Sequence, residues 1–309
     1  MTKKISAVIC TYNRDKYIGK SIESLVNQTL LDNQYEIIIV DNKSTDNTRE
    51  VVCDGFKDVN HLSYYYEPVQ GLSQARNTGT KNAKGTYIAF LDDDAIACND
   101  WLERIVDAFE NYEAQLGSVG GKISPIWEVE RPSWLSDEIV PVLTVLDWFD
   151  KPTILSEKYW LAGANIAFPK FLLDQMGGFD TSLGRKGSNL LSNEETVMRQ
   201  DIEKAGYQCL YDPKIYVDHH VPSERVNQKW FKRRFYWQGV SKAVLASQAP
   251  GFSRSDQFRA LAKEIKSMIS SPSLIVRLLF PSNNPSHFTR KCIAMRKLGY
   301  IIGLLGVHS

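Results

Sequence analysis

Three consecutive aspartates, Asp92, Asp93 and Asp94, have the residue types and spacing best suited to chemistry in this sequence. They directly follow the apolar run 87–91, which is typical of a buried strand. Because neighbouring carboxylates repel one another, such a cluster needs a cation or hydrogen-bond donors. In an extended segment Asp92 and Asp94 point to the same side, and their oxygens suit Mg²⁺ or Mn²⁺, ions that also bind substrate phosphates. The alternative interpretation is a solvated turn before a helix capped by Asp100.

Two other predicted strands also end in polar residues. The run 5–10 is followed by residues 11–14, and the run 35–40 is followed by Asp41. A single such Asp is more often a helix cap or a turn residue. Ligands of parallel sheets bind at the carboxyl ends of the strands, so three polar strand ends together predict a small-molecule site. The sequence has no P-loop and no Gly-x-Gly-x-x-Gly after the first strand, which argues against a dinucleotide-binding enzyme.

The elements that must position these residues alternate along the first third of the chain. Short β-rich runs are separated by helix-like stretches, a pattern that predicts an α/β fold with a Rossmann-like, mostly parallel sheet flanked by helices. The predicted strands are 5–10, 35–40, 62–66 and 87–91, and the predicted helices are 16–27, 48–57 and 72–83.

The later part of the chain is less regular. Residues 125–161 are rich in Trp and Pro, and we interpret them as a loop region that covers a site. A helix is predicted at 193–205, followed by strand-like segments at 208–211 and 214–218. After Pro222 the pattern is helical and basic, with helices at 227–249 and 255–269 and a broken apolar and basic tail.

Composition excludes several classes of protein. The chain has 309 residues, of which 43% are hydrophobic and 24% charged, so disorder and coiled coil are poor interpretations. The five cysteines form no Cys-x-x-Cys pair, which argues against a zinc site and a disulfide framework and favours a reducing cytosol. No apolar run approaches the roughly 18–20 residues that a membrane span needs. We therefore expect a cytoplasmic protein.

Four motifs resemble family 2 glycosyltransferases, in order and at suitable spacing, and the resemblance covers about residues 3–240. It implies a GT-A fold and inverting transfer of a sugar from a nucleoside diphosphate sugar. The motifs are AVICTYNR at 7–14, IVDNKSTDNT at 39–48, GLSQARNTG at 71–79 and GTYIAFLDDD at 85–94. Further similarity to the acceptor half lies in GGFD at 177–180, Glu194-Glu195 and Gly206-Tyr207.

The resemblance also implies roles for single residues. The loop 11–14 corresponds to the segment that lines the nucleotide, and Asp41 to the carboxylate that binds the base, typically uracil, so the donor is expected to be a UDP-sugar. Arg76 is expected near the nucleotide and the acidic cluster. Asp92 would face the ribose or the metal, and Asp94 would ligate Mn²⁺ or Mg²⁺. The nucleotide-binding set is thus Thr11, Tyr12, Asn13, Arg14, Asp41, Arg76, Asp92 and Asp93.

A carboxylate must also accept the proton of the acceptor hydroxyl, which is a poor nucleophile. The family usually has Glu-Asp at the position of Glu194-Glu195, and its second residue is the base. Glu195 is therefore the candidate, although the sequence leaves open which of the two faces the sugar. The alternative is a pair of first-turn acids favoured by the helix dipole.

A histidine completes the metal site in several GT-A enzymes. Here His219 and His220 are adjacent, and by register His219 fits this position best. The sequence does not decide between these two residues, nor does it exclude a structural role for both.

We divide the chain into a GT-A catalytic domain, 1–222, and a basic helical extension, 223–309. The catalytic domain comprises a nucleotide-binding half, 1–124, and an acceptor half, 125–222, in which Trp160-Leu-Ala-Gly-Ala-Asn165 resembles a sugar-pocket segment. The expected acceptor is a hydroxyl of a saccharide or of a lipid-linked saccharide, in cell-surface polysaccharide or glycan biosynthesis. The alternatives are a sugar nucleotidyltransferase and a catalytically silent nucleotide-sugar binding protein. Sugar, acceptor and linkage do not follow from the sequence.

The extension has 15 Lys and Arg but 3 Asp and Glu, whereas the rest of the chain has 22 and 33. Aromatic and basic residues interleave at 230–237, and residues 299–307 are apolar. We hypothesise that this tail attaches peripherally to the anionic inner face of the cell membrane. A protein partner or plain solvent could equally face these bases, and no nucleic acid is expected because no binding motif accompanies them.

Overall fold

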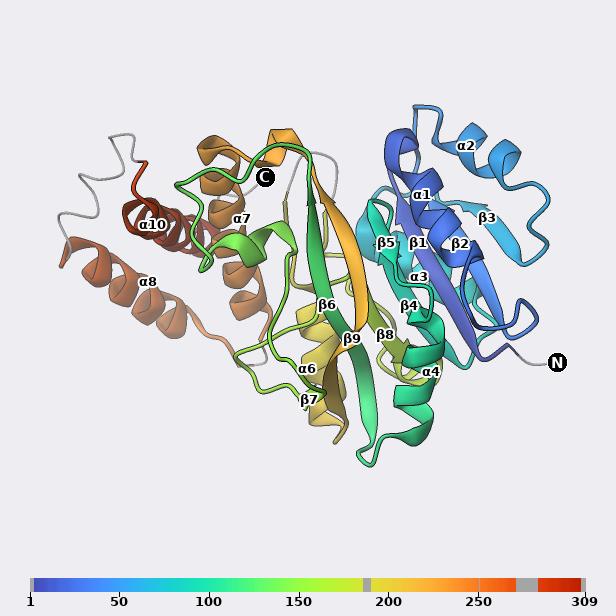
Figure 1. Cartoon of the computed structure of the whole chain (residues 1–309). Coiled ribbons are helices and arrows are strands. Elements are labelled where there is room, and N and C mark those ends of the chain that lie inside the picture. Colours follow the sequence, from blue (N-terminus) through green and yellow to red (C-terminus); the bar gives the residue numbers. More distant parts are fainter. Residues whose placement is uncertain (1–2, 186–189, 250, 271–282, 307–309) are drawn as a thin grey trace. The chain divides into compact units, whose positions relative to one another are not determined.

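The apolar runs of the first hundred residues form the parallel part of one mixed sheet, as predicted (Figure 1). The computed structural model describes residues 3–185, 190–249, 251–270 and 283–306. The strands lie in the order β3-β2-β1-β4, with Ile5 opposite both Tyr35 and Tyr87. Their bounds are β1 (Ile5–Thr11), β2 (Tyr35–Asp41), β3 (Leu62–Tyr66) and β4 (Tyr87–Asp92).

The sheet continues beyond β4 with antiparallel strands that the sequence pattern did not reveal in full. Beside β4 follow β8 (Asn165–Pro169), β6 (Leu116–Trp127), β9 (Gln208–Val221) and β5 (Ala95–Ala97), while β7 (Thr153–Ile154) pairs with β9. The two segments predicted at 208–211 and 214–218 are one continuous strand. The side chain of Asn165 is fully buried and donates to the carbonyls of Lys122, at 3.1 Å, and Ile215, at 2.8 Å, which fastens β8 to β6 and β9.

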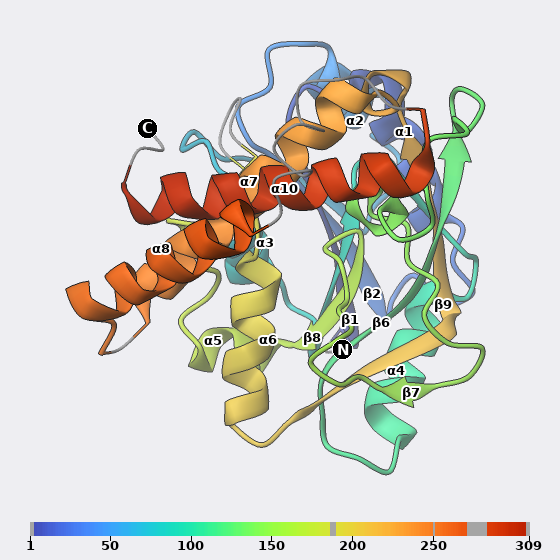
Figure 2. The same ribbon diagram turned by 90° about the vertical axis from the view of Figure 1, so that its left-hand side faces the viewer.

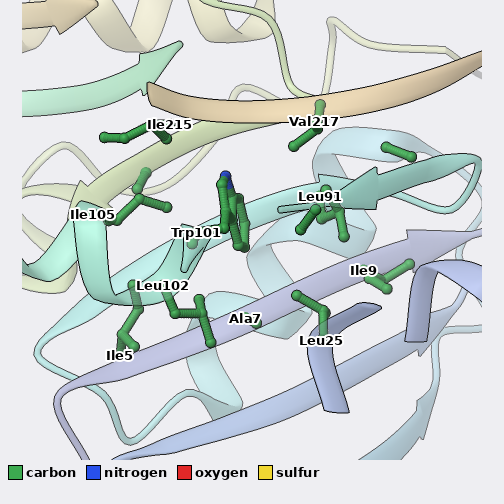
Figure 3. Close-up of a cluster of buried hydrophobic side chains, with 14 of the residues drawn as sticks. Ile5, Ala7, Ile9, Leu25, Leu91, Trp101, Leu102, Ile105, Ile215 and Val217 are labelled. Atoms are coloured by element: carbon green, nitrogen blue, oxygen red, sulfur yellow. The ribbon is translucent and has the colours of Figure 1, made fainter. Parts of the chain in front are cut away.

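Helices cover both faces of the sheet because successive strand residues point to opposite sides. On β1, Ala7 and Ile9 pack with apolar residues of α1 (Asp15–Val26), α2 (Thr48–Gly55) and α4 (Trp101–Asn111). Figure 3 shows this cluster around Trp101, whose ring nitrogen donates to Asn165 at 2.9 Å. Val8 instead joins the cluster of α3 (Leu72–Asn82), α5 (Lys170–Gln175) and α6 (Glu194–Lys204). These observations confirm the α/β fold class.

The chain forms two compact units. The first comprises Met1–Ile126, Thr144–Gly187 and Glu194–His220, and the second comprises Trp127–Leu143, Ser188–Asn193 and Val221–Ser309. The second unit thus begins close to the boundary that we predicted at 222, but it also includes two earlier segments. The division into catalytic domain and extension stays a prediction.

The second unit is built from α7 (Gln228–Gln248), α8 (Arg254–Ile269) and α10 (Pro285–Leu304), with short 3₁₀ turns at Val140–Leu143 and Ser223–Arg225. Figure 2 shows α10 lying across α7. A Cβ at Gly299 would overlap the carbonyl of Tyr236, so the two helices approach at backbone distance. Trp134 packs edge-on against Phe231 and Phe288, with ring centroids 5.3 and 4.8 Å away.

One expectation about the tail is wrong. The segment predicted as broken contains the 20-residue helix α10, which starts after the cap residue Asn284 with Pro285 in its first turn. In α7, Phe231 and Phe235 are buried, whereas Arg233 is exposed. Among the described residues, no helix has both the length and the apolar composition required to cross a membrane.

Candidate active site

Two loops at the carboxyl ends of β1 and β2 are interlocked by hydrogen bonds. The backbone N–H of Asn13 donates to Ser44 Oγ at 2.9 Å, and Asn13 Oδ1 accepts from the N–H of Thr45 at 2.8 Å. Asn13 has a positive φ of 53°, a conformation that Asn tolerates better than most residues. The neighbouring Tyr12 is 41% exposed, so its ring is accessible to a ligand.

Asp41 ends β2 and is almost fully buried. Its Oδ1 accepts from the N–H of Ser44 at 2.8 Å, and its Oδ2 accepts from the hydroxyl of Tyr64 at 2.7 Å. A carboxylate has about four acceptor sites, so Asp41 can still accept a further hydrogen bond. The sequence analysis did not single out Tyr64, which helps to orient this carboxylate.

The three aspartates after β4 lie close together, and the positive charge of Arg14 neutralises part of their negative charge. Arg14 lies with Nε 3.7 Å from Asp93 Oδ1 and Nη2 3.7 Å from Asp94 Oδ2. Burial, followed by the negative charge of Asp94, raises the pKa of Asp93 to about 7. The same two causes raise the pKa of Asp92. The cluster therefore carries more negative charge than its surroundings neutralise.

His219 joins this cluster from β9, where it pairs with Ala95 of β5. Its Nε2 lies 3.1 Å from Asp94 Oδ1, and its Nδ1 has no hydrogen-bond partner among the described residues. One potential ligand atom each of Asp92, Asp94 and His219 lie within 4.8 Å of one another. The ring of His220 instead packs on Tyr17, 5.1 Å away. The geometry thus brings His219, and not His220, to the acidic cluster.

This donor set fits a divalent cation. Burial, followed by the charge of Asp94, raises the pKa of Asp92, and a buried imidazole nitrogen lies beside the two carboxylates, so positive charge is stabilising here. Oxygen-rich sets of this kind suit Mg²⁺ and Mn²⁺ better than soft ions.

Arg76 forms the second charged group of the site. It lies on α3, is 2% exposed, and contacts Glu194 Oε1 through Nη1 at 3.1 Å and Glu195 Oε1 through Nη2 at 2.9 Å. A Cβ at Gly163 would overlap the guanidinium of Arg76 and lie 2.5 Å from Glu195 Oε1. A side chain at position 163 would therefore displace the ends of the Arg76 and Glu195 side chains.

The two glutamates differ in environment although they are adjacent. Glu194 is 3% exposed, and its Oε2 has no hydrogen-bond partner in the part of the chain that the structure describes. Burial, followed by the charge of Glu195, raises the pKa of Glu194 to about 7. Burial acts to raise the pKa of Glu195, but the charge of Arg76 together with hydrogen bonds to the carboxylate outweighs it and holds this pKa below its usual value. The side chain of Glu195 is 19% exposed. Glu195 is therefore ionised and more accessible.

The charges of the site interact across its two groups. The charge of Arg76 acts to lower the pKa of Asp92, while the charge of Asp92 acts to raise that of Arg76. The acidic cluster and the glutamate pair are therefore coupled electrostatically through Arg76. Sequence reasoning missed Arg185, whose charge acts on Asp92, Glu194 and Glu195. The only signal for it was the basic, glycine-flanked stretch GRKG at 184–187.

Comparisons with known proteins agree with this geometry. The model of the family described as "Glycosyl transferase family 2" matches residues 6–167. A glucosyl-dolichyl phosphate glucuronosyltransferase of Haloferax volcanii is 30% identical over 288 residues, covering 88% of this chain and 88% of the relative. A dolichyl N-acetyl-alpha-D-glucosaminyl phosphate 3-beta-D-2,3-diacetamido-2,3-dideoxy-beta-D-glucuronosyltransferase of Methanococcus voltae is 28% identical over 252 residues, covering 78% of this chain and 73% of the relative.

Among solved structures, a similar one is the mannosyltransferase PcManGT from Pyrobaculum calidifontis, in complex with GDP-Man and Mn²⁺. The two align with a TM-score of 0.66 over 100% of this chain and 89% of the other, at 18% sequence identity. At this identity the likeness concerns the fold.

Proposed function

Because the chain belongs to glycosyl transferase family 2 and is a glycosyltransferase, we propose that it transfers a sugar, with inversion, from a UDP-sugar to a hydroxyl of a lipid-linked saccharide. The observation that carries this proposal is the pair of charged groups at one site. An acidic cluster with His219 can bind a cation, and Arg76 links it electrostatically to the ionised, accessible Glu195. Family membership argues against the nucleotidyltransferase and the silent binding protein.

In this proposal Asp92, Asp94 and His219 hold Mn²⁺ or Mg²⁺. The bound ion would stabilise the negative charge that develops on the leaving diphosphate. Arg14, at the end of the proposed nucleotide-binding loop, lies 3.7 Å from both Asp93 and Asp94, so its charge helps to orient these aspartates. Such counter-charges are needed because an isolated negative charge in a site of low dielectric costs free energy.

Glu195 acts as the general base of the proposed reaction. It accepts the proton of the acceptor hydroxyl while that oxygen attacks the anomeric carbon from the side opposite the diphosphate. Arg76 supports this role because it keeps Glu195 ionised and fixes its orientation through the 2.9 Å contact. Glu194 holds the other side of the guanidinium and is a positioning residue.

The nature of donor and acceptor has separate support. Asp41 has acceptor capacity left after its contacts with Ser44 and Tyr64, as recognition of a base N–H requires. The names of the two relatives describe sugars carried on dolichyl phosphate, which supports a lipid-linked acceptor and a role in glycan biosynthesis. Peripheral membrane contact through residues 223–309, on the cytoplasmic side, belongs to the same proposal.

The test is a donor screen with the purified full chain. Nucleotide release is measured for a panel of UDP- and GDP-sugars with Mn²⁺, with and without a short-chain prenyl phosphate sugar, and the anomeric configuration of the product is read by NMR. We expect acceptor-dependent release of UDP and inversion at the anomeric carbon. Acceptor-dependent release of GDP alone, or retention, would refute the corresponding part of the proposal.

A further inference from the structure

Helix α8 of the second unit exposes two large apolar side chains on one side. Phe258 is 77% exposed and Ile265 is 44% exposed. At 3.6 residues per turn, positions 258 and 265 lie only about 20° apart around the helix axis. Three exposed basic residues, Arg254, Arg259 and Lys266, lie within about 110° of this pair around the axis, whereas Lys263 lies on the far side of the helix.

The opposite side of α8 packs on α10. The side-chain amide of Gln257 donates to the carbonyl of Leu304, and the ammonium of Lys297 donates to Ser267. Glu264 is half-buried, and burial followed by the charge of Glu264 raises the pKa of Tyr300 on α10, so this acid faces the protein. The other acid of α8, Asp256, lies 3.6 Å from Arg259. The exposed side therefore combines apolar and positively charged groups.

The segments that the sequence suggested for membrane contact are largely used inside the second unit. Phe231 and Phe235 are buried, and Leu304 is only 3% exposed. Gly299 and Gly303 lie against the backbone and side chains of α7. These residues cannot enter a lipid interface without unpacking the helices.

We propose that the exposed side of α8 docks on an anionic lipid bilayer, with Phe258 and Ile265 inserted among the headgroups. Helices that lie in a membrane interface combine aromatic or aliphatic side chains on one face with Lys and Arg beside them. The three flanking bases complement the negative potential of an anionic leaflet, while Asp256 lies on the far side of the helix from Phe258 and Ile265. The inference rests on the proposed lipid-linked acceptor, which it would bring within reach of the enzyme.

The test is flotation of the full chain with vesicles of phosphatidylcholine alone or mixed with phosphatidylglycerol. The apolar variant is Phe258→Ser with Ile265→Ser, and its control is Phe171→Ser, a 54% exposed aromatic on α5. The charge variant changes Arg254, Arg259 and Lys266 to Gln, and its control changes the exposed Lys20, Lys57 and Lys81 to Gln. All these positions are on the surface, and thermal melting verifies that each variant is folded.

We expect the wild type to bind anionic vesicles and to bind neutral ones weakly. The apolar variant should bind at least about tenfold more weakly at any salt concentration. The charge variant should lose about a hundredfold at low salt and little at high salt. Absence of vesicle binding by the wild type, or equal binding by each variant and its control, would overturn the proposal.

Transfer assays separate this inference from the proposed function. With a water-soluble short-chain acceptor, all variants should have the wild-type rate, while transfer to a long-chain acceptor in vesicles should fall in parallel with binding. A wild type that glycosylates the soluble acceptor without binding vesicles refutes the docking of α8 and leaves the proposed function intact. Vesicle binding through α8 without transfer to either acceptor would refute the proposed function and leave the docking of α8 intact.

Discussion

The two units of this chain differ in where their charged side chains lie. The first buries charged groups and pairs them, as Arg76 does with Glu194 and Glu195 at 3.1 and 2.9 Å. The second has an aromatic interior, built around Trp134, and carries most of its bases outside, with Lys291 as a buried exception. Between residues 226 and 306 the sequence contains only two acids, both in α8.

This difference indicates where stability and function reside. Removing charges from water costs free energy that ion pairing only partly returns, so a buried charged cluster is weak evidence for stability. Exposed bases cost little and create a field that attracts anions. Substitutions in the buried cluster should therefore affect activity more than stability, and substitutions in the packed helices of the second unit should do the reverse.

The largest effect on activity is expected for Asp94→Ala, which should abolish transfer and remove the Mn²⁺-dependent shift in melting temperature. The free energy of unfolding should change by less than about 1 kcal/mol, because the lost attraction to Arg14 is offset by the lost repulsion from Asp92 and Asp93. Asp58→Asn, at an exposed position, is the control. Wild-type turnover of Asp94→Ala at saturating Mn²⁺ would contradict the assignment of the metal site.

Glu195→Gln should retain UDP binding but lose roughly 10²–10⁴-fold in transfer rate, the usual scale for a missing general base. Glu194→Gln is the matched comparison, since it makes the same change one residue earlier and on the buried side of Arg76. Rates at saturating donor and acceptor, with UDP affinity measured by calorimetry, distinguish the two roles. A larger loss in Glu194→Gln would assign the base to Glu194.

Gly299→Ala should destabilise the chain by about 2 kcal/mol or more, because the added methyl overlaps the backbone of Tyr236 on α7. Below its melting temperature the variant should still transfer sugar to a soluble acceptor at close to the wild-type rate. Gly55→Ala is the control, since nothing lies within 4 Å of a Cβ at that position. If Gly299→Ala lost activity but not stability, the second unit would not differ from the first in the way that we propose.

Protonation of Glu194 should make stability depend on pH. Its pKa rises from 4.5 to about 7 on folding, so the folded state binds this proton more tightly than the unfolded state. The resulting stabilisation is present below pH 4.5 and is lost as the pH rises through 7. Glu194→Gln should therefore gain in melting temperature relative to the wild type between pH 4.5 and 7. A difference that is independent of pH would show that Glu194 titrates normally.

The smallest effect concerns Lys291, a strongly buried lysine of the second unit. Lys291 is 5% exposed, and burial followed by the charge of Lys232 lowers its pKa. Lys291→Met keeps the length of the side chain and removes this charge, which should stabilise the protein by about 1 kcal/mol. Urea denaturation measures the change, with the exposed Lys229→Met as control. Destabilisation would mean that the ammonium has a stabilising partner.

Much of the fold was predictable where local pattern and tertiary role agree. β3 was predicted with its bounds as found, and the other parallel strands were one residue short. β6 escaped prediction because its sequence, LGSVGGKISPIW, has no apolar alternation. Its glycines are required by packing, since a Cβ at Gly121 would overlap the carbonyls of Asp212 and Ile215 on β9. Such close approach between distant strands leaves no periodic signal.

By itself the sequence determined the family, the α/β class and the edge at which the polar residues gather, because strand periodicity and the direction of parallel strands fix that edge. Only the tertiary structure decided which distant residues meet there. Arg76 and Glu194 are 118 positions apart, and His219 reaches Asp94 through the pairing of β9 with β5. Burial likewise decided that adjacent Glu194 and Glu195 differ in pKa, since desolvation and the charge of Arg76 depend on neighbours that local sequence does not specify.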